Sequence, residues 1–330
     1  MSAPPLLELR NLSTHYVSAR GTRVVRAVDE VSLTLEAGST LGIVGESGSG
    51  KSTLALTILR LLPPAAHITG GEILFEGEDL RTKSDVEMRR IRGKRIAMIL
   101  QDPMASLNPL FTVGDQVAEP LRVHEGVGRA GAWSRAKDLL KSVRISAPES
   151  RVGEYPHQMS GGMRQRIVGA IAISCAPRLL IADEPTTSLD LTIQAQYLNL
   201  LRDLQRQHEL ALIFITHNLG IVAKMCDQVA VMYAGRLVEW GPVTRIFDAP
   251  AHPYTQALLG SIPRMGGDAR ERLTAIEGQP PDLAAPPSGC AFHPRCPHVM
   301  AQCREQAPPE TVLAQRHTTR CWLSVPAPAR

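Results

Sequence analysis

Apolar and polar residues alternate over much of the first 45 residues, in LLELRNLSTHYV and VSLTLEAGSTLGIVG. Because alternation divides side chains between the two faces of a strand, these stretches predict β-strands separated by turns. Strand-like TLGIVG runs directly into a Gly-rich loop and then into KSTLALTILRLL, a predicted helix ended by Pro63 and Pro64. RIAMIL, just ahead of Gln101, is a further predicted strand.

The pattern changes between about residues 103 and 175, where helices and loops are predicted without a strong strand signal. Strands return with RLLIADEP and LALIFITH, short apolar runs typical of buried parallel strands. QVAVMYAGRLVEWG predicts a hairpin that turns at Gly235. The segment TIQAQYLNLLRDLQRQH predicts a helix with one apolar face, formed by Ile193, Tyr197, Leu200, Leu201 and Leu204. The chain is therefore predicted to be an α/β core that a helical insertion interrupts.

Composition narrows the function classes. Of 330 residues, 44% are hydrophobic and 21% charged, which is ordinary for a protein with a buried core. The net charge of +4 is small and aromatic content is 4%, so no nucleic-acid surface is expected. Neither a signal peptide nor an apolar run long enough to span a membrane is evident, so a cytosolic location is expected.

The segment GESGSGKST fits the phosphate-binding pattern G-x-x-x-x-G-K-[ST] between a predicted strand and a predicted helix. Gly48 and Gly50 allow the backbone to curl, so that successive N–H groups face phosphate oxygens at a helix N-terminus. Lys51 is expected to reach the β- and γ-phosphates, and the Ser52 hydroxyl to bind Mg²⁺. A plain Gly/Ser-rich turn is the competing interpretation. The predicted nucleotide contacts here are Gly45, Ser47, Gly48, Ser49, Gly50, Lys51, Ser52 and Thr53.

Two carboxylates follow the apolar run LLIA. Asp183 stands at the end of this predicted strand, where it can meet the magnesium ion through water. Glu184 follows at once and is well placed to polarise an attacking water. A pair of solvated acids at a strand end is the alternative interpretation.

Five ordered motifs decide between the classes of phosphate-binding-loop protein. HQMSGGMRQR contains Ser160-Gly161-Gly162, and here the sequence resembles the ATP-binding subunits of ABC transporters, whose signature is L-S-G-G-Q. The resemblance covers residue 6 to about 248. It implies that Gln101 is the Q-loop glutamine and a magnesium ligand, and that SLD at 188–190, with Asp190, is the D-loop. It also implies that His217 is the switch histidine and that Tyr16 stacks on adenine.

The chain departs from the family pattern at three positions. Met159 and Met163 stand where the signature usually has Leu and Gln, so any hydrogen bond made by that glutamine is absent or replaced. Asn218 follows His217 where an acidic residue is common, and we expect little effect from this change.

The resemblance also implies partners. In this family the signature of one subunit completes the nucleotide site of the other, so a chain with one loop and one signature should work as a dimer. ATP binding closes the dimer, and hydrolysis opens it and drives two membrane permease subunits. Residues from Met104 to Leu110 are expected to meet those permeases. The protein is thus expected at the cytoplasmic face of the inner membrane, as a peripheral subunit.

Longer stretches resemble the dipeptide and oligopeptide importer branch: LQDPMASLNP, YPHQMSGGMRQR, ADEPTTSLD, HPYTQALLGSIPR and EGQPPDL. The resemblance implies import of di- or oligopeptides, with a separate extracytoplasmic binding protein selecting the ligand. Nickel and glutathione importers belong to the same branch and stay open as alternatives. The branch usually pairs two different ATPases, so a heterodimer is expected, and a homodimer is the alternative.

The chain's last part is rich in proline and cysteine. GQPPDLAAPPSG resembles a linker into a segment with the spacing Cys290-x₅-Cys296-x₆-Cys303-x₁₇-Cys321. Zinc sites favour C-x₂₋₄-C pairs, so four irregularly spaced thiolates suit an iron–sulfur cluster better. Branch members with this segment are understood to carry a [4Fe–4S] cluster. Zinc with His293, His298 or His317 is the alternative, and free thiols come third.

The predicted fold is therefore an α/β phosphate-binding-loop core with an antiparallel β subdomain, a helical insertion at about 103–175 and a small C-terminal extension. Residues 1–248 form the predicted nucleotide-binding domain, and 249–330 the extension. A soluble ABC ATPase of DNA repair or translation control is a weaker alternative, because the chain has neither heptad runs nor a second loop of this kind. An unrelated phosphate-loop kinase is disfavoured by the signature and by His217.

Overall fold

The structure is a computed structural model that describes residues 4–102, 106–187, 189–262, 276–314 and 316–326. The chain divides into two compact units. Unit 1 comprises Met1–Leu35, Thr40–Arg81 and Ile215–Arg330, and unit 2 comprises Glu36–Ser39 and Thr82–Phe214. Ser188 of the predicted D-loop and Met104 of the predicted permease contact lie outside the described residues.

Unit 1 contains an antiparallel sheet in the order β2-β1-β4-β5. Its strands are β1 (Leu7–Val17), β2 (Val24–Leu35), β4 (Ala66–Phe75) and β5 (Glu78–Asp79). Leu7 and Leu9 are almost fully buried, as expected where alternate side chains face a core, and a shift in strand register after Leu9 brings Leu12 to the core as well. The strands predicted from the alternating N-terminal pattern are therefore confirmed, and they belong to an antiparallel sheet in which β4 and β5 are strands that the pattern did not predict.

A second group of strands in unit 1 has the order β11-β12-β10-β9-β3, in which β11 is Thr311–Ala314 and β12 is His317–Thr319. Strand β3 (Thr40–Val44) pairs in parallel with β9 (Gln228–Tyr233), which forms an antiparallel hairpin with β10 (Arg236–Pro242). Ala234 and Gly235 both have positive φ, at 49° and 82°, as a two-residue hairpin turn requires. The hairpin predicted to turn at Gly235 is confirmed.

The described residues of unit 1 ahead of position 263 include the helices α1 (Lys51–Ile58), α9 (Leu219–Met225) and α10 (Val243–Asp248), and α11 (Pro253–Gly260) begins the C-terminal region, residues 249–330. The prediction that Pro63 and Pro64 end the first helix is wrong, since the helix stops at Ile58. Arg60 has a φ of 52°, and the Leu61 N–H donates to the Leu56 carbonyl at 2.9 Å. This left-handed turn ends the helix several residues before the prolines.

Unit 2 combines strands with a group of helices. The strands β6 (Ile96–Ile99), β7 (Leu179–Asp183) and β8 (Ala211–Ile215) lie in the order β8-β7-β6, and β6 and β7 are parallel. All residues of β7 and β8 are buried, which explains their continuous apolar sequences. The helices are α2 (Asp85–Ile91), α4 (Val113–Glu125), α5 (Arg129–Ser142), α6 (Pro148–Arg151), α7 (Gly161–Ile173) and α8 (Leu191–Gln207).

The helical insertion predicted at about 103–175 corresponds to α4, α5, α6 and α7, and none of its described residues lies in a strand. In α8 the predicted apolar face buries Tyr197, Leu200, Leu201 and Leu204. Ile193, the fifth predicted member of that face, is only half-buried. No helix in the described ranges has both the length and the apolar character needed to cross a membrane.

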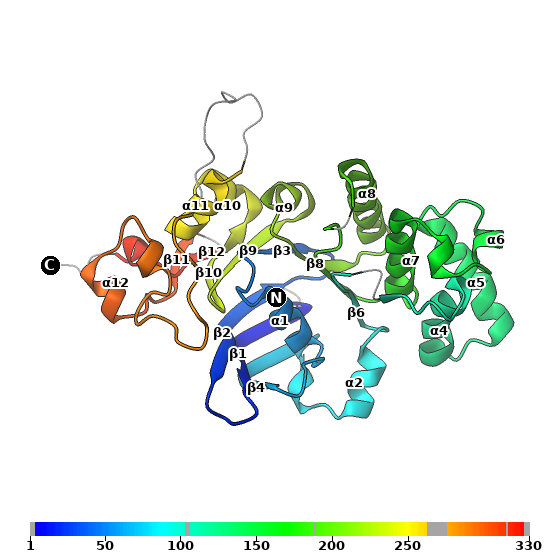
Figure 1. Ribbon diagram of the computed structural model, residues 1–330, viewed down its shortest axis with the longest axis horizontal. Helices are drawn as coiled ribbons and strands as arrows, with labels where there is room; N and C mark the ends of the chain where they lie inside the picture. Colours follow the sequence, from blue (N-terminus) through cyan, green and yellow to red (C-terminus); the bar gives the residue numbers. More distant parts are fainter. Residues whose placement is uncertain (1–3, 103–105, 188, 263–275, 315, 327–330) are drawn as a thin grey trace. The chain divides into compact units, whose positions relative to one another are not determined.

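The C-terminal region joins the sheet of unit 1. Strands β11 (Thr311–Ala314) and β12 (His317–Thr319) form an antiparallel pair, and β12 also pairs with β10 (Figure 1). The short helix α12 (Ala301–Glu305) precedes them. The carboxylate of Glu239, only 1% exposed, accepts hydrogen bonds from the N–H groups of Ala251 and His252 and lies 2.9 Å from His317 Nε2. One buried carboxylate thus links three segments.

Candidate functional site

The phosphate-binding loop occupies residues 45–50, between β3 and α1 of unit 1. Gly45, Gly48 and Gly50 have φ values of 150°, 78° and 103°, a region that other residues rarely adopt. A Cβ atom on Gly50 would lie 2.0 Å from the Ala27 carbonyl oxygen, and one on Gly45 2.2 Å from that of Met232. Both backbone conformation and close packing therefore require glycine at these ends of the loop.

Lys51 lies at the centre of this loop and is only 6% exposed. Its Nζ donates to the carbonyl oxygens of Gly45 and Glu46, at 2.8 and 2.9 Å, and lies 3.4 Å from Ser49 Oγ. The Ser49 N–H in turn donates to the Glu46 carbonyl at 3.2 Å. The loop therefore encloses a positive charge at a helix N-terminus, which favours an anion there.

The other predicted residues of the loop differ in exposure. Ser47, Gly48 and Ser52 are exposed, whereas the side chain of Ser49 is buried inside the loop. Exposure leaves the Ser52 hydroxyl accessible to a magnesium ion. The buried Ser49 hydroxyl instead contributes to the arrangement around Lys51.

Tyr16 lies beside the loop, on β1. Its hydroxyl is 3.4 Å from Thr53 Oγ1, in the first turn of α1, and its ring is half-buried. A tyrosine face next to a phosphate-binding loop can stack on a nucleotide base.

His217 follows β8 and is exposed. The next residue, Asn218, caps the N-terminus of α9, where its side chain accepts from the N–H groups of Gly220 and Ile221 at 3.0 and 3.3 Å. Asparagine caps helices as well as aspartate does, so its replacement of the common acidic residue has a structural explanation.

In unit 2, Gln101 and Glu184 are in direct contact. The Gln101 Nε2 donates to Glu184 Oε2 at 3.2 Å, and the Thr187 hydroxyl donates to the same oxygen at 2.9 Å. Glu184 has a φ of 44°, an uncommon conformation for a non-glycine residue that is found at functional sites. Asp183, at the end of β7, is 4% exposed. Thr187 was not predicted, because only its position in space shows its contact with the glutamate.

The signature residues begin α7. Ser160 is the N-cap, and its hydroxyl accepts from the Met163 N–H at 3.3 Å. Ser160 and Gly161 are exposed, Met163 is half-buried, and Met159 is buried in the core. The buried site of Met159 accepts a hydrophobic side chain, so methionine can occupy the position where the family signature usually has leucine.

A cavity of about 380 Å³ in unit 2 brings the signature and the D-loop together. Its lining includes Ser160, Gly161, Gly162 and Asp190. The Asp190 carboxylate is already engaged, because it caps α8 by accepting from the N–H groups of Thr192 and Ile193 at 3.1 and 2.9 Å. From the sequence Asp190 was expected in the D-loop and as a nucleotide contact of that motif, and its capping of α8 is a new observation.

The four C-terminal cysteines lie in one region of unit 1. The Cys290 N–H donates to the Cys303 carbonyl at 2.8 Å, and the Cys290 thiol lies within electrostatic reach of Cys296, Cys303 and Cys321. Burial raises the pKa of Cys290 to about 11. All four are free thiols, and no three or more Cys, His, Asp or Glu side chains in the described ranges are arranged to hold a metal ion.

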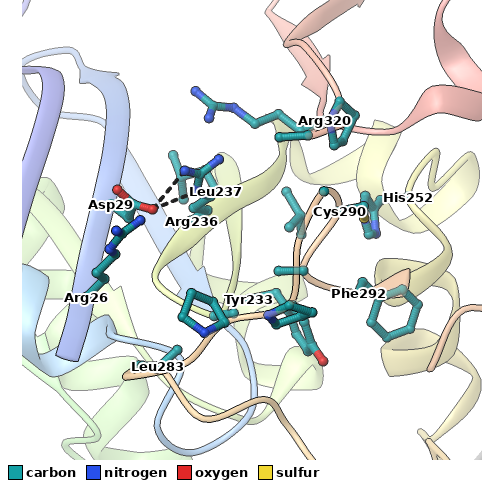
Figure 2. A pocket seen from close by; sticks show the side chains of 18 residues that line it. Arg26, Asp29, Tyr233, Arg236, Leu237, His252, Leu283, Cys290, Phe292 and Arg320 are labelled. Atoms are coloured by element: carbon teal, nitrogen blue, oxygen red, sulfur yellow. Dashed lines mark hydrogen bonds and ion pairs between the residues drawn. The ribbon is translucent and has the colours of Figure 1, made fainter. Parts of the chain in front are cut away.

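A cavity of about 240 Å³ lies next to Cys290 (Figure 2). Tyr233, His252 and Phe292 line it, and the ion pair between Asp29 and Arg236, at 2.8 Å, borders it. Burial lowers the pKa of His252 to about 3, so this imidazole is neutral at physiological pH. Its Nδ1 accepts from the Tyr254 N–H at 3.0 Å, which assigns the proton to Nε2.

Two family models match the chain. The model described as ABC transporter matches residues 28–187, and the one described as oligopeptide/dipeptide transporter, C-terminal region, matches residues 238–303. The second match covers three of the four clustered cysteines.

Similar curated proteins match almost the whole chain. The dipeptide transport ATP-binding protein DppD of Bacillus subtilis is 50% identical over 96% of this chain and 94% of its own length. The oligopeptide transport ATP-binding protein OppD of Haemophilus influenzae is 47% identical over 97% of this chain and 98% of its own. The probable peptide ABC transporter ATP-binding protein y4tR of Sinorhizobium fredii is 50% identical over 97% and 95%.

Solved structures agree in fold. The dimeric ATP-binding cassette MJ0796 bound to ADP and Pi gives a TM-score of 0.64 at 26% identity, and covers 72% of this chain and 98% of its own. CbiO1 from Clostridium perfringens, part of the ABC transporter complex cbiONQ, gives 0.62 at 26% identity over 74% and 91%.

Proposed function

The chain belongs to the ATP-binding proteins of ABC transporters, and from this membership we propose that it hydrolyses ATP to energise the import of di- or oligopeptides across the bacterial inner membrane. The observation that carries the substrate class is the match of residues 238–303 to the oligopeptide/dipeptide C-terminal region. The near full-length identity of about 50% to relatives named for dipeptide and peptide transport supports it.

ATP binds, in this proposal, to the loop of unit 1. Gly48 and Gly50 let the backbone N–H groups face the phosphates. The Lys51 ammonium leaves the carbonyl oxygens of Gly45 and Glu46 and binds the β- and γ-phosphates instead. Tyr16 stacks on the adenine beside Thr53, a placement supported by the 3.4 Å distance between their hydroxyls. The remaining nucleotide contacts of the loop are Gly45, Ser47, Ser49 and Ser52.

Hydrolysis uses a water molecule that Glu184 polarises. Gln101 and Thr187 donate to its Oε2 at 3.2 and 2.9 Å, which orients the carboxylate that takes a proton from water. Ser52, Gln101 and Asp183 are the proposed magnesium ligands, which fits their oxygen donors. Bound Mg²⁺ would neutralise charge on the phosphates. His217 contacts the γ-phosphate as the switch residue.

A second ATPase subunit completes the site. The exposed Ser160 and Gly161 at the start of α7 offer a hydroxyl and a helix N-terminus to the γ-phosphate held by the partner, with Gly162 beside them. Leu191, which follows Asp190, is 84% exposed, and an apolar side chain so exposed is better covered in a dimer. We propose a heterodimer with a related chain.

Two permease subunits and an extracytoplasmic binding protein are the other proposed partners. Leu110 is 80% exposed and Phe111 54%, which gives an apolar surface suited to the cytoplasmic helices of a permease. We propose that this contact holds the protein at the cytoplasmic face of the inner membrane, as a peripheral subunit. No nucleic-acid partner is proposed.

Cells that lack this protein should lose uptake of a labelled tripeptide, because the second ATPase subunit cannot complete its nucleotide sites without this chain. The intact gene should restore uptake, and a Glu184→Gln version should not. Nickel and glutathione uptake serve as controls and should stay unchanged. Loss of nickel or glutathione uptake with intact tripeptide uptake would contradict peptide import and assign one of the other ligands.

We further propose that Cys290, Cys296, Cys303 and Cys321 hold a [4Fe–4S] cluster, with Zn²⁺ as the alternative. The support is the donor chemistry, because soft sulfur ligands suit an iron–sulfur centre, whereas the described side chains are not arranged around a metal ion in this structure. Each thiol would lose its proton to bind, and metal binding would offset the effect of burial on the thiolates.

Anaerobically purified protein should contain about four iron and about four acid-labile sulfide per chain, the stoichiometry of a [4Fe–4S] cluster. Cys290→Ala should lower both, whereas Cys226→Ala, a buried thiol of the same unit outside the group, should leave them unchanged. Zinc without sulfide would favour the alternative. Protein with neither metal would contradict the proposal.

A further inference from the structure

Arg295 of the C-terminal region is bound directly to the phosphate-binding loop, although 249 positions of sequence separate the two. Its Nη1 and Nη2 donate to the two carboxylate oxygens of Glu46, at 2.7 and 3.0 Å. The Arg295 side chain is only 4% exposed and that of Glu46 27%. A paired, largely buried fork of this kind is stronger and more directional than an exposed ion pair.

Further contacts fix the orientation of the guanidinium. Its Nε donates to the Glu277 carbonyl at 2.9 Å and its Nη2 to the Ile276 carbonyl at 3.3 Å. Its Cζ lies 5.9 Å from the centre of the Tyr233 ring, whose hydroxyl accepts from Nη1 at 3.4 Å. These contacts leave Arg295 little freedom to move away from Glu46.

A second contact reaches the same residue of the loop. The Glu46 N–H donates to the hydroxyl oxygen of Tyr254 at 2.8 Å. Tyr254 is fully buried, and its ring packs against those of Tyr233 and Phe292, with centres 4.6 and 5.4 Å apart. Tyr233 and Phe292 also line the cavity beside Cys290 (Figure 2). The C-terminal region therefore holds both the side chain and the backbone of Glu46.

The contacts of Glu46 continue into the loop. Its carbonyl oxygen accepts from Lys51 Nζ at 2.9 Å and from the Ser49 N–H at 3.2 Å. A displacement of Glu46 would therefore displace the lysine that contacts phosphate. Its carboxylate is also a negative charge within a loop that binds phosphates, and Arg295 neutralises it.

We propose that Arg295 is a positioning residue for ATP binding, which holds Glu46 in place and cancels its charge next to the phosphates. This inference rests on the proposed ATP site in the loop. Arg295 does not touch the nucleotide and acts through Glu46, so its removal should affect the affinity for ATP more than the rate of the chemical step.

Arg295→Ala in the full-length protein should weaken equilibrium binding of a fluorescent Mg-ATP analogue by about tenfold, through the lost pair and the uncompensated carboxylate. KM for ATP should rise by a similar factor, with kcat nearly unchanged. Arg295→Lys should restore part of the affinity. Arg23→Ala is the matched control, because Arg23 binds Asp282 at 3.0 Å on the exposed surface of the same unit and does not contact the loop.

The double variant Arg295→Ala/Glu46→Gln tests whether the loss of ATP affinity comes from the uncompensated charge of Glu46 or from a general loss of protein stability. If the defect comes from the uncompensated carboxylate, Glu46→Gln should restore most of the affinity that Arg295→Ala removes. Additive losses, or unchanged affinity in Arg295→Ala, would overturn the inference. Lys51→Ala, measured beside it, tells the two proposals apart: unchanged affinity in Lys51→Ala would instead overturn the ATP site itself.

Discussion

Glu184→Gln should lower the rate of ATP hydrolysis by about 10²–10⁴-fold, the usual contribution of a general base. The amide has nearly the shape of the carboxylate, and its oxygen can still accept from Gln101 and Thr187, so the local geometry should persist. An amide, however, cannot take a proton from the attacking water. ATP should therefore still bind and close the dimer, and the closed dimer should accumulate.

Steady-state phosphate release measures the first effect, and size-exclusion chromatography with ATP and Mg²⁺ measures the second. Glu209→Gln is the matched control: it makes the same change at another glutamate of unit 2 with positive φ, 48° against 44° at Glu184, outside the proposed site. Hydrolysis that continues undiminished in Glu184→Gln would remove this residue as the base. Loss of ATP binding together with hydrolysis would show that the carboxylate has a structural role instead.

Elements with strong local patterns could be predicted from the sequence. The continuous apolar runs of β7 and β8 correspond to strands in which every residue is buried, and the glycines of the loop have the positive φ values that its function requires. Periodicity also predicted α8, and four of the five apolar positions expected on its inner face are buried in the structure. In these places local preference and tertiary environment agree, so the pattern is sufficient.

Contacts between distant segments could not be predicted in the same way. Strand β12 has only three residues, and it exists because β10 offers it a free edge. The bond between Arg295 and Glu46 joins two charged residues that each look like ordinary surface positions in the sequence. The end of α1 was misassigned because Pro63 and Pro64 are strong helix breakers, while the left-handed turn at Arg60 carries no glycine to reveal it.

Lys51→Ala should weaken ATP binding by roughly 10- to 100-fold, since a hydrogen bond to a charged group contributes about 1.5–3 kcal/mol. Lys51 is 6% exposed and enclosed by the loop, so water cannot replace its ammonium group without a loss of ATP affinity. The variant also leaves the carbonyls of Gly45 and Glu46 without this donor, and a lower unfolding temperature is expected beside the lost affinity.

Lys94→Ala is the control that separates the loss of ATP affinity from the effect of removing a lysine that donates to a backbone carbonyl. Lys94 also donates to a backbone carbonyl, that of His124 at 3.3 Å, but it is exposed and lies outside the loop. Binding of a fluorescent ATP analogue should be normal in this control and weak in Lys51→Ala. Lys51→Arg keeps the positive charge but replaces the compact ammonium with a wide guanidinium. The guanidinium does not fit where three loop oxygens surround one nitrogen. The unfolding temperature should therefore recover more than the affinity for ATP. Unaltered ATP affinity in Lys51→Ala would contradict the assignment of residues 45–50 as the phosphate-binding loop.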